Sequence, residues 1–270
     1  MVVFENVAFV FVAGLLTALA TGLGAIPFFL VDDFSDRWNV LLWGLASGIM
    51  VAASLFGLIR EGLNYGSPVL LVPGLLTGVV LVVVAHEVLE GFDHGPQKFE
   101  QADFKKLLLI LGILTVHSFP EGVAVGVSFA ELGLDTAGAG ETLAIADVAV
   151  PLLAVFMTVA ISIHNIPEGT AIAIPLRSLG VSEPRMVWWA VFSSLPQPVG
   201  AVIAYYFVTL AREFLPFGFG FAAGAMVYLV ATEFVPEALE YGQNLAGGGR
   251  RELVGGALTG ALAMVPLAFI

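Results

Sequence analysis

Two related hexapeptides, HSFPEG over His117–Gly122 and HNIPEG over His164–Gly169, lie in the middle of long apolar segments. Each places a histidine four residues before a glutamate, and positions i and i+4 share one face of a helix. Ionisable groups at bilayer depth cost about 2.5–3.5 kcal/mol each, so they are rare there without a functional reason. Imidazole and carboxylate groups suit borderline divalent metals such as zinc and iron(II). Two such pairs on consecutive segments predict one metal site inside a membrane.

The proline inside each hexapeptide removes a backbone N–H and clashes with the carbonyl four residues earlier, at Val116 and Ile163. The resulting kink frees a backbone oxygen beside the histidine, and the glycine that follows lets a neighbouring helix approach closely. A simpler interpretation is that both histidines are buried and bonded to backbone at ordinary kinks. Two buried glutamates that face each other cannot both stay ionised without a cation, so the pairing favours metal binding.

The composition is that of a membrane protein, because 59% of the residues are apolar and only 12% are charged. A soluble domain has about 25% charged residues. The chain contains no cysteine, so thiolate ligands and disulfides are excluded. A net charge of -12 argues against nucleic acid and anionic lipid as partners. The acidic balance also suggests a halophilic source, a hypothesis that rests on composition alone.

Apolar runs long enough to cross a bilayer recur along the whole chain. They predict an all-α polytopic membrane protein with a single transmembrane domain, residues 1–270, and a cytoplasmic loop at about 92–105. The last span is short for a bilayer and would need local thinning. The eight expected transmembrane helices cover residues 3–30, 38–62, 68–91, 105–130, 146–175, 185–211, 214–240 and 251–270.

Basic residues predict the orientation, because cytoplasmic loops of membrane proteins carry an excess of lysine and arginine. The even-numbered connectors hold only Arg60 and Arg212, and the two terminal segments hold no basic residue. We therefore expect the odd-numbered connectors in the cytoplasm and both termini outside. The odd-numbered connectors hold Arg37, Lys98, Lys105, Lys106, Arg177, Arg185, Arg250 and Arg251.

An internal repeat emerges when the chain is compared with itself. A shift of 176 residues aligns Gly44–Val51 with Gly220–Val227, and a shift of 182 aligns Leu71–Gly78 with Leu253–Gly260. Spans 1–3 therefore resemble spans 6–8, with spans 4 and 5 between them in a 3+2+3 arrangement. Because the second triplet starts on the opposite side of the membrane, the repeat is inverted, which is typical of secondary transporters.

The paired hexapeptides, together with Ala20–Pro27, Ala46–Met50 and Ala222–Met226, resemble the ZIP family of divalent metal transporters, in its GufA-like prokaryotic branch. The similarity covers essentially the whole chain. It implies eight spans with both termini outside and a metal site formed mainly by spans 4 and 5. The ligands that this resemblance implies are His117, Glu121, His164 and Glu168, with the thioether of Met50 as a neighbour.

The same resemblance implies where a second metal would bind. Family members that hold one use positions that correspond to Ser118, Asn165 and Gln197, with the two glutamates bridging the metals. This chain departs from the family pattern, because Ser118 replaces a common asparagine and Gln197 replaces a glutamate found in many relatives. The loss of a carboxylate lowers the negative charge of the site. We therefore expect one tight site and a second that is weak or absent.

Other ionisable residues allow two interpretations each. Glu61, Glu233 and Glu237 are candidates to line a vestibule. Glu61 and Glu237 lie near span ends and read equally well as solvated carboxylates, whereas Glu233 lies deeper, which favours a functional role. A cluster at the end of span 3 is an exit or sensing site for metal or a solvated acidic loop. Its members are His86, Glu87, Glu90, Asp93 and His94.

Together these features predict a secondary transporter in the plasma membrane that carries divalent metal into the cytoplasm, and not an enzyme. Zinc is the expected substrate, and iron(II), manganese, cobalt, nickel and cadmium are alternatives. No GxxxxGK[ST] loop is present to couple ATP directly. The alternative functions are an intramembrane zinc-dependent hydrolase and a metal sensor without transport. Small residues at Gly44 and Gly48 would suit either a homodimer contact or packing within one subunit.

Overall fold

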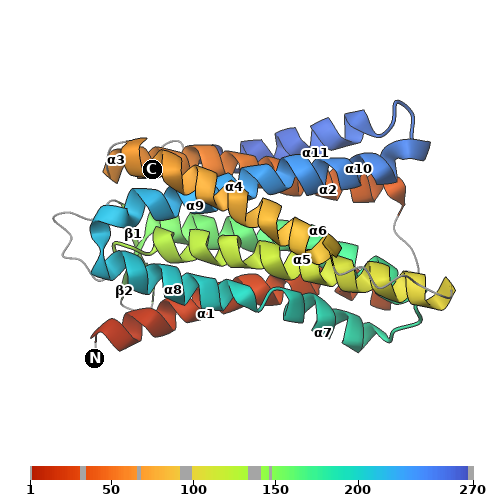
Figure 1. Ribbon diagram of the computed structural model, residues 1–270, viewed down its shortest axis with the longest axis horizontal. Coiled ribbons are helices and arrows are strands. Elements are labelled where there is room, and N and C mark those ends of the chain that lie inside the picture. Colours follow the sequence, from red (N-terminus) through yellow and green to blue (C-terminus); the bar gives the residue numbers. More distant parts are fainter. Residues whose placement is uncertain are drawn as a thin grey trace.

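The computed structural model describes residues 2–30, 35–65, 68–91, 99–132, 141–145 and 148–266. In this part of the chain, eight helical segments run back and forth along one axis, so that α1 begins and α11 ends at the same end of the bundle (Figure 1). The segments are α1 (Val2–Leu23) with η1 (Ile26–Phe29); α2 (Asp36–Ala52) with η2 (Ala53–Ile59) and α3 (Arg60–Tyr65); α4 (Pro68–Gly91); α5 (Phe99–Ser128); α6 (Leu152–Ser178); α7 (Glu183–Ser193) with α8 (Pro196–Leu210); η3 (Arg212–Phe214) with α9 (Leu215–Leu229), η4 (Val230–Phe234), α10 (Val235–Tyr241) and η5 (Gly242–Asn244); and α11 (Arg250–Ala263).

Within the described residues, six of these segments are long enough and apolar enough to cross a bilayer. The helices α5 and α11 complete the eight. The prediction of an all-α multi-span membrane protein is therefore confirmed. The six apolar spans are Glu5–Phe29, Asp36–Tyr65, Pro68–Val88, Leu152–Arg177, Glu183–Leu210 and Arg212–Asn244.

Three expected boundaries were wrong, and one of them is the end of the last span, where α11 ends at Ala263 rather than at residue 270. The helix α5 begins at Phe99 rather than near residue 105, because the polar segment before the apolar run contains good helix formers such as Gln101 and Ala102. The rest of the expected loop, residues 92–98, lies outside the described residues. Span 5 was expected from residue 146, but α6 begins at Leu152.

A β-hairpin precedes α6 and was not predicted. Its strands β1 (Thr142–Ile145) and β2 (Val148–Pro151) pair antiparallel, with Thr142 opposite Pro151 and Ile145 opposite Val148. β-Branched residues in both strands favour an extended backbone. Because the segment is apolar, its sequence reads equally well as the start of a helix, and only the pairing of the two strands distinguishes them.

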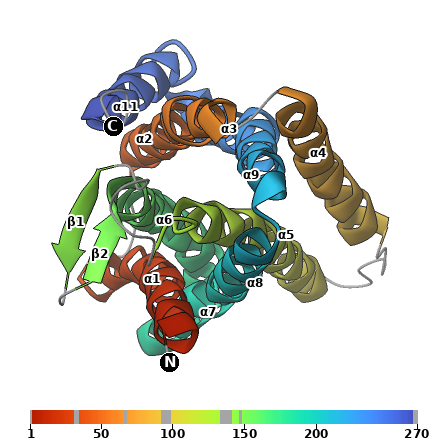
Figure 2. The same ribbon diagram turned by 90° about the vertical axis from the view of Figure 1, so that its left-hand side faces the viewer.

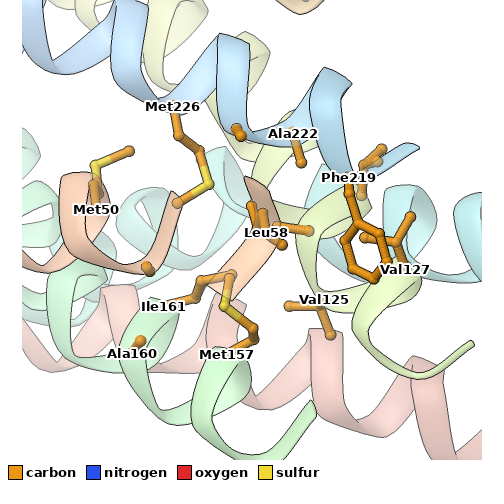
Figure 3. Packing of buried hydrophobic residues seen from close by; sticks show 14 of the residues in the cluster. Met50, Leu58, Val125, Val127, Met157, Ala160, Ile161, Phe219, Ala222 and Met226 are labelled. Carbon is orange, nitrogen blue, oxygen red and sulfur yellow. The ribbon is translucent and has the colours of Figure 1, made fainter. Parts of the chain in front are cut away.

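The helices form three rows when the bundle is viewed from its end (Figure 2). One outer row holds α11, α2, α9 and α4, the other holds α1, α7 and α8, and α5 and α6 lie between them. The hexapeptide helices are therefore enclosed on both sides. Apolar side chains from three of these elements fill the space between rows, including Met50 of α2, Met226 of α9, and Met157 of α6 (Figure 3).

Glycines bring the paired helices of the outer row into backbone contact. A Cβ added at Gly44 or Gly48 of α2 would overlap the carbonyls of Leu253 and Ala257 of α11. The face that contains Gly44 and Gly48 is therefore used inside the subunit, where small residues let helices pack closely. Of the two uses that the sequence left open for this face, the structure selects packing within one chain.

Candidate metal site

The two hexapeptides lie within the central helices, where Pro120 interrupts α5 and Pro167 interrupts α6. A buried polar group is costly unless it is paired, so a concentration of such groups marks a functional place. Every residue proposed for the site from the sequence is at most 2% exposed. These residues are Met50, His117, Ser118, Glu121, His164, Asn165, Glu168 and Gln197.

Three of the four principal residues come together. One ligand atom from each of Glu121, His164 and Glu168 lies within 4.8 Å of the other two. His164 Nε2 is 3.2 Å from Glu121 Oε1. Among the described residues, neither His164 Nδ1 nor Glu168 Oε1 has a hydrogen-bond partner. Two buried carboxylates this close cannot both be ionised without a positive counter-charge, and a nitrogen and oxygen donor set suits a divalent transition metal.

His117 is outside this group of three. Its ring packs edge-on against the ring of His86 from α4, with the ring centroids 6.0 Å apart and the planes at 68°. His117 Nδ1 is buried and lacks a hydrogen bond within the described part of the chain. The assignment of His117 as a ligand therefore stays a prediction.

The two amides of the site form a chain of hydrogen bonds to one glutamate. Asn165 Nδ2 donates to the Thr17 carbonyl at 2.8 Å and to Gln197 Oε1 at 3.1 Å. Gln197 Nε2 in turn donates to Glu121 Oε2 at 2.6 Å. Thr17 was not expected in the site, and no spacing in the sequence links it to Asn165. Ser118 is buried beside these groups on α5.

The glycines that end the hexapeptides determine how closely the outer helices approach. A Cβ at Gly122 would overlap the Gln197 carbonyl of α8, and a Cβ at Gly169 would overlap the Thr21 carbonyl of α1. Such contacts leave no room for a side chain. Gly122 therefore sets the distance at which Gln197 meets Glu121. The predicted role of these glycines in close helix packing is confirmed.

His86 was expected to act with residues on its own helix, but it faces another one. His86 Nε2 lies 2.8 Å from Glu233 Oε1 of η4, although the direction between the two atoms does not suit a hydrogen bond. With His117 on its other side, His86 connects Glu233 to the hexapeptide of α5. Glu87 is exposed. The side chains of Glu90, Asp93 and His94 lie outside the described residues.

Glu61 lines a pocket together with other residues of α3 and with Pro151 of the hairpin. The helix α3 and the hairpin lie at the same end of the bundle (Figure 1). Asn64 Nδ2 donates to Glu61 Oε2 at 3.2 Å, and the Tyr65 hydroxyl donates to Glu131. Glu131 and Glu141 are additional carboxylates in this pocket that sequence reasoning missed, because they follow α5 and precede β1 in a connector. Glu237 lies in α10 and does not line this pocket.

Met50 packs in the apolar core. Its side chain lies in one cluster with Met226 and Ile161 (Figure 3). The structure therefore gives the Met50 thioether an apolar environment, and its place beside a bound metal stays a prediction.

Comparison with known proteins gives the same family throughout. A sequence profile described as "ZIP Zinc transporter" matches residues 139–268. The zinc transporter GufA of Myxococcus xanthus is 33% identical over 275 residues, covering 94% of this chain and 96% of GufA. The zinc transporter ZIPB of Bordetella bronchiseptica is 32% identical over 251 residues, covering 88% of this chain and 75% of ZIPB.

A longer relative is more similar in sequence. An Arabidopsis thaliana protein that carries a provisional zinc-transporter name is 39% identical over 225 residues, or 83% of this chain. The match covers 33% of that protein, so the chain spans about a third of its length. The two bacterial relatives are matched over most of their own length and over most of this chain, so the family assignment rests on them.

Proposed function

This chain belongs to the ZIP zinc transporter family, and from that premise we propose that it is a secondary transporter that carries zinc into the cytoplasm. The observation that carries this proposal is the buried group of Glu121, His164 and Glu168, whose ligand atoms lie within 4.8 Å of one another. Histidine and carboxylate ligands must lose protons to bind metal, so the site binds zinc and still exchanges it. Iron(II), manganese, cobalt, nickel and cadmium are secondary candidates for the same donor set.

The ligand set of this proposal begins with those three residues. His117 joins them from one turn earlier on α5, and Met50 stays a neighbour rather than a ligand. His86 packs against His117 and lies 2.8 Å from Glu233, and His86 and Glu233 form the next binding position for the ion. With the odd-numbered connectors in the cytoplasm, these two residues are on the inner side of the site. The acidic pocket that contains Glu61 is then at the outer entrance.

Alternating access would follow from an inverted repeat, and several contacts support such a repeat. The pair α2–α11 is joined by glycine contacts, and so is the pair α4–α9, as expected if α2 matches α9 and α4 matches α11. A π-helical turn follows α2 over Ala53–Ile59, and another follows α9 over Val230–Phe234. With the shift of 176 residues, the first would fall on 229–235, which overlaps the second.

Contacts of the central helices support the same symmetry. Gly169 meets Thr21, and Gly122 meets Gln197. Thr21 and Gln197 are 176 residues apart, as are Gly24 and Gly200, which contact the backbone at Ile166 and Phe119. The proposed twofold axis therefore relates α5 to α6, and it also relates the first outer triplet of spans to the second. The arrangement is one transmembrane domain over residues 1–270, placed in the plasma membrane with both termini outside.

The two alternative functions differ in their support. A hydrolase needs a general base outside the ligand set, and membership of a transporter family argues against an enzyme. A sensor without transport would use the same buried ligands, and it would bind metal tightly without flux. Only a measurement of flux separates a sensor from a carrier.

The test is zinc uptake by purified protein in proteoliposomes. We expect saturable uptake by the wild type and none by the double variant Glu121→Ala, Glu168→Ala. The matched control removes two exposed carboxylates away from the site, in Glu213→Ala, Glu240→Ala, and keeps uptake. Zinc binding by the wild type without any flux would contradict transport and favour the sensor.

A further inference from the structure

The hydrogen bonds around Gln197 have a single consistent direction. The chain of bonds starts at the Thr17 carbonyl, which only accepts, and ends at the Glu121 carboxylate, which accepts when ionised. Asn165 must present its NH₂ group to Thr17, and the same group reaches Gln197 Oε1. Gln197 must then present its own NH₂ group to Glu121. A flipped amide at either position would set two acceptors against each other.

This direction matters because an amide NH₂ group has no lone pair to offer a metal. The positions that the family resemblance assigns to a second metal are Ser118, Asn165 and Gln197. In this chain the donor nitrogen of Gln197 lies 2.6 Å from Glu121 Oε2, the oxygen that would bridge two ions. Glu121 Oε1 lies 3.2 Å from His164 and remains on the side of the first site.

Building on the proposed function, we propose that Gln197 takes the place of a second metal ion and makes this a single-ion transporter. The charge of the buried group agrees with one ion. Glu121 and Glu168 carry two negative charges when ionised, and one divalent cation neutralises them. A second divalent cation would leave a buried charge of +2, which an apolar surrounding disfavours strongly. Ser118, Asn165 and Gln197 add no charge.

Gln197 is in this proposal a positioning residue for Glu121. By holding Oε2, it leaves Oε1 as the oxygen that faces the metal. The contact between Gly122 and the Gln197 backbone keeps α5 and α8 close enough for this bond. Thr17 and Asn165 orient Gln197 from its other side. The count of bound ions is therefore decided by a network that reaches from α1 through α6 and α8 to α5.

The test is the number of zinc ions bound per chain, measured on the purified full-length protein in detergent by equilibrium dialysis and elemental analysis. We expect one ion for the wild type and two for Gln197→Glu, which replaces the donor by a carboxylate of the same size. The matched control is Asn6→Asp, an amide-to-acid change near the start of α1, where Asn6 donates to the Leu132 carbonyl. It should keep one ion.

The outcomes separate this inference from the transport proposal. Two ions in the wild type would overturn the single-ion inference and leave zinc transport standing. One ion in Gln197→Glu, in protein that elutes as the wild type does, would show that Gln197 is not what excludes the second metal. No zinc bound by the wild type would overturn the proposed function itself. The wild-type count needs no variant, so the test does not depend on the folding of Gln197→Glu.

Discussion

The two hexapeptides have the same pattern and matching backbone contacts, but their polar surroundings differ. The α5 copy meets α8, where Gln197 donates to Glu121. The α6 copy meets α1, where Thr21 is at the corresponding place and shares a hydrogen bond of 2.7 Å with Ser194 instead. Glu121 thus has both His164 and Gln197 as partners, whereas Glu168 Oε1 has no hydrogen-bond partner in the described structure.

The two hexapeptides therefore share their close helix packing and differ in their hydrogen bonds. The close contacts of Gly122 and Gly169 require only a missing side chain, so both copies keep them. The hydrogen bonds depend on one side chain in each outer helix, and those two side chains differ. Gln197 therefore holds Glu121 Oε2 from α8, a contact that Thr21 does not provide to Glu168 in the described structure.

The largest expected difference is between the two histidines. His164→Ala removes a member of the buried group of three and should lower zinc affinity by more than about 100-fold. His117→Ala removes the proposed ligand that lies outside this group of three, and it should lower zinc affinity less, by about 10–100-fold. Zinc titration of the purified variants measures both. Equal losses would mean that His117 is a ligand of the same rank.

The next difference concerns packing at the two glycines. Gly169→Ala and Gly122→Ala should each lower stability by about 1–3 kcal/mol, because an added methyl group meets a backbone carbonyl that cannot move freely. Thermal unfolding in detergent measures this loss. Gly255→Ala in α11 is the control, because no atom lies within 4 Å of the added Cβ. It should be neutral or stabilising, and a comparable loss there would contradict the explanation by close contact.

The smallest effect is expected on the α1 side. Thr21→Val removes the hydroxyl that pairs with Ser194 but keeps the shape of the side chain. The loss should be about 1 kcal/mol of stability, the usual value of one hydrogen bond, with zinc affinity unchanged. Unfolding and zinc titration on the same sample check both. A marked loss of zinc affinity would show that Thr21 supports Glu168 as Gln197 supports Glu121.

Much of this fold was predictable from local patterns. Apolar length alone predicted the multi-span all-α architecture, because a bilayer requires long apolar helices. The hairpin before α6 was missed, since its apolar strands resemble a buried helix until their pairing is known. The early start of α5 at Phe99 was missed for a related reason, because a helix can continue past the apolar run that signals it.

The sequence by itself determined the donor atoms and their place on the helices, because a spacing of four residues with a proline between is a local property. It thereby predicted His117, Glu121, His164 and Glu168 as partners, and the structure brings the last three together. Only the tertiary structure decided which groups meet across helices: Gln197 with Glu121, and His86 with Glu233 and His117. These contacts depend on the rotation and distance of packed helices. That geometry is set by glycine contacts far apart in the chain, and no local spacing encodes it.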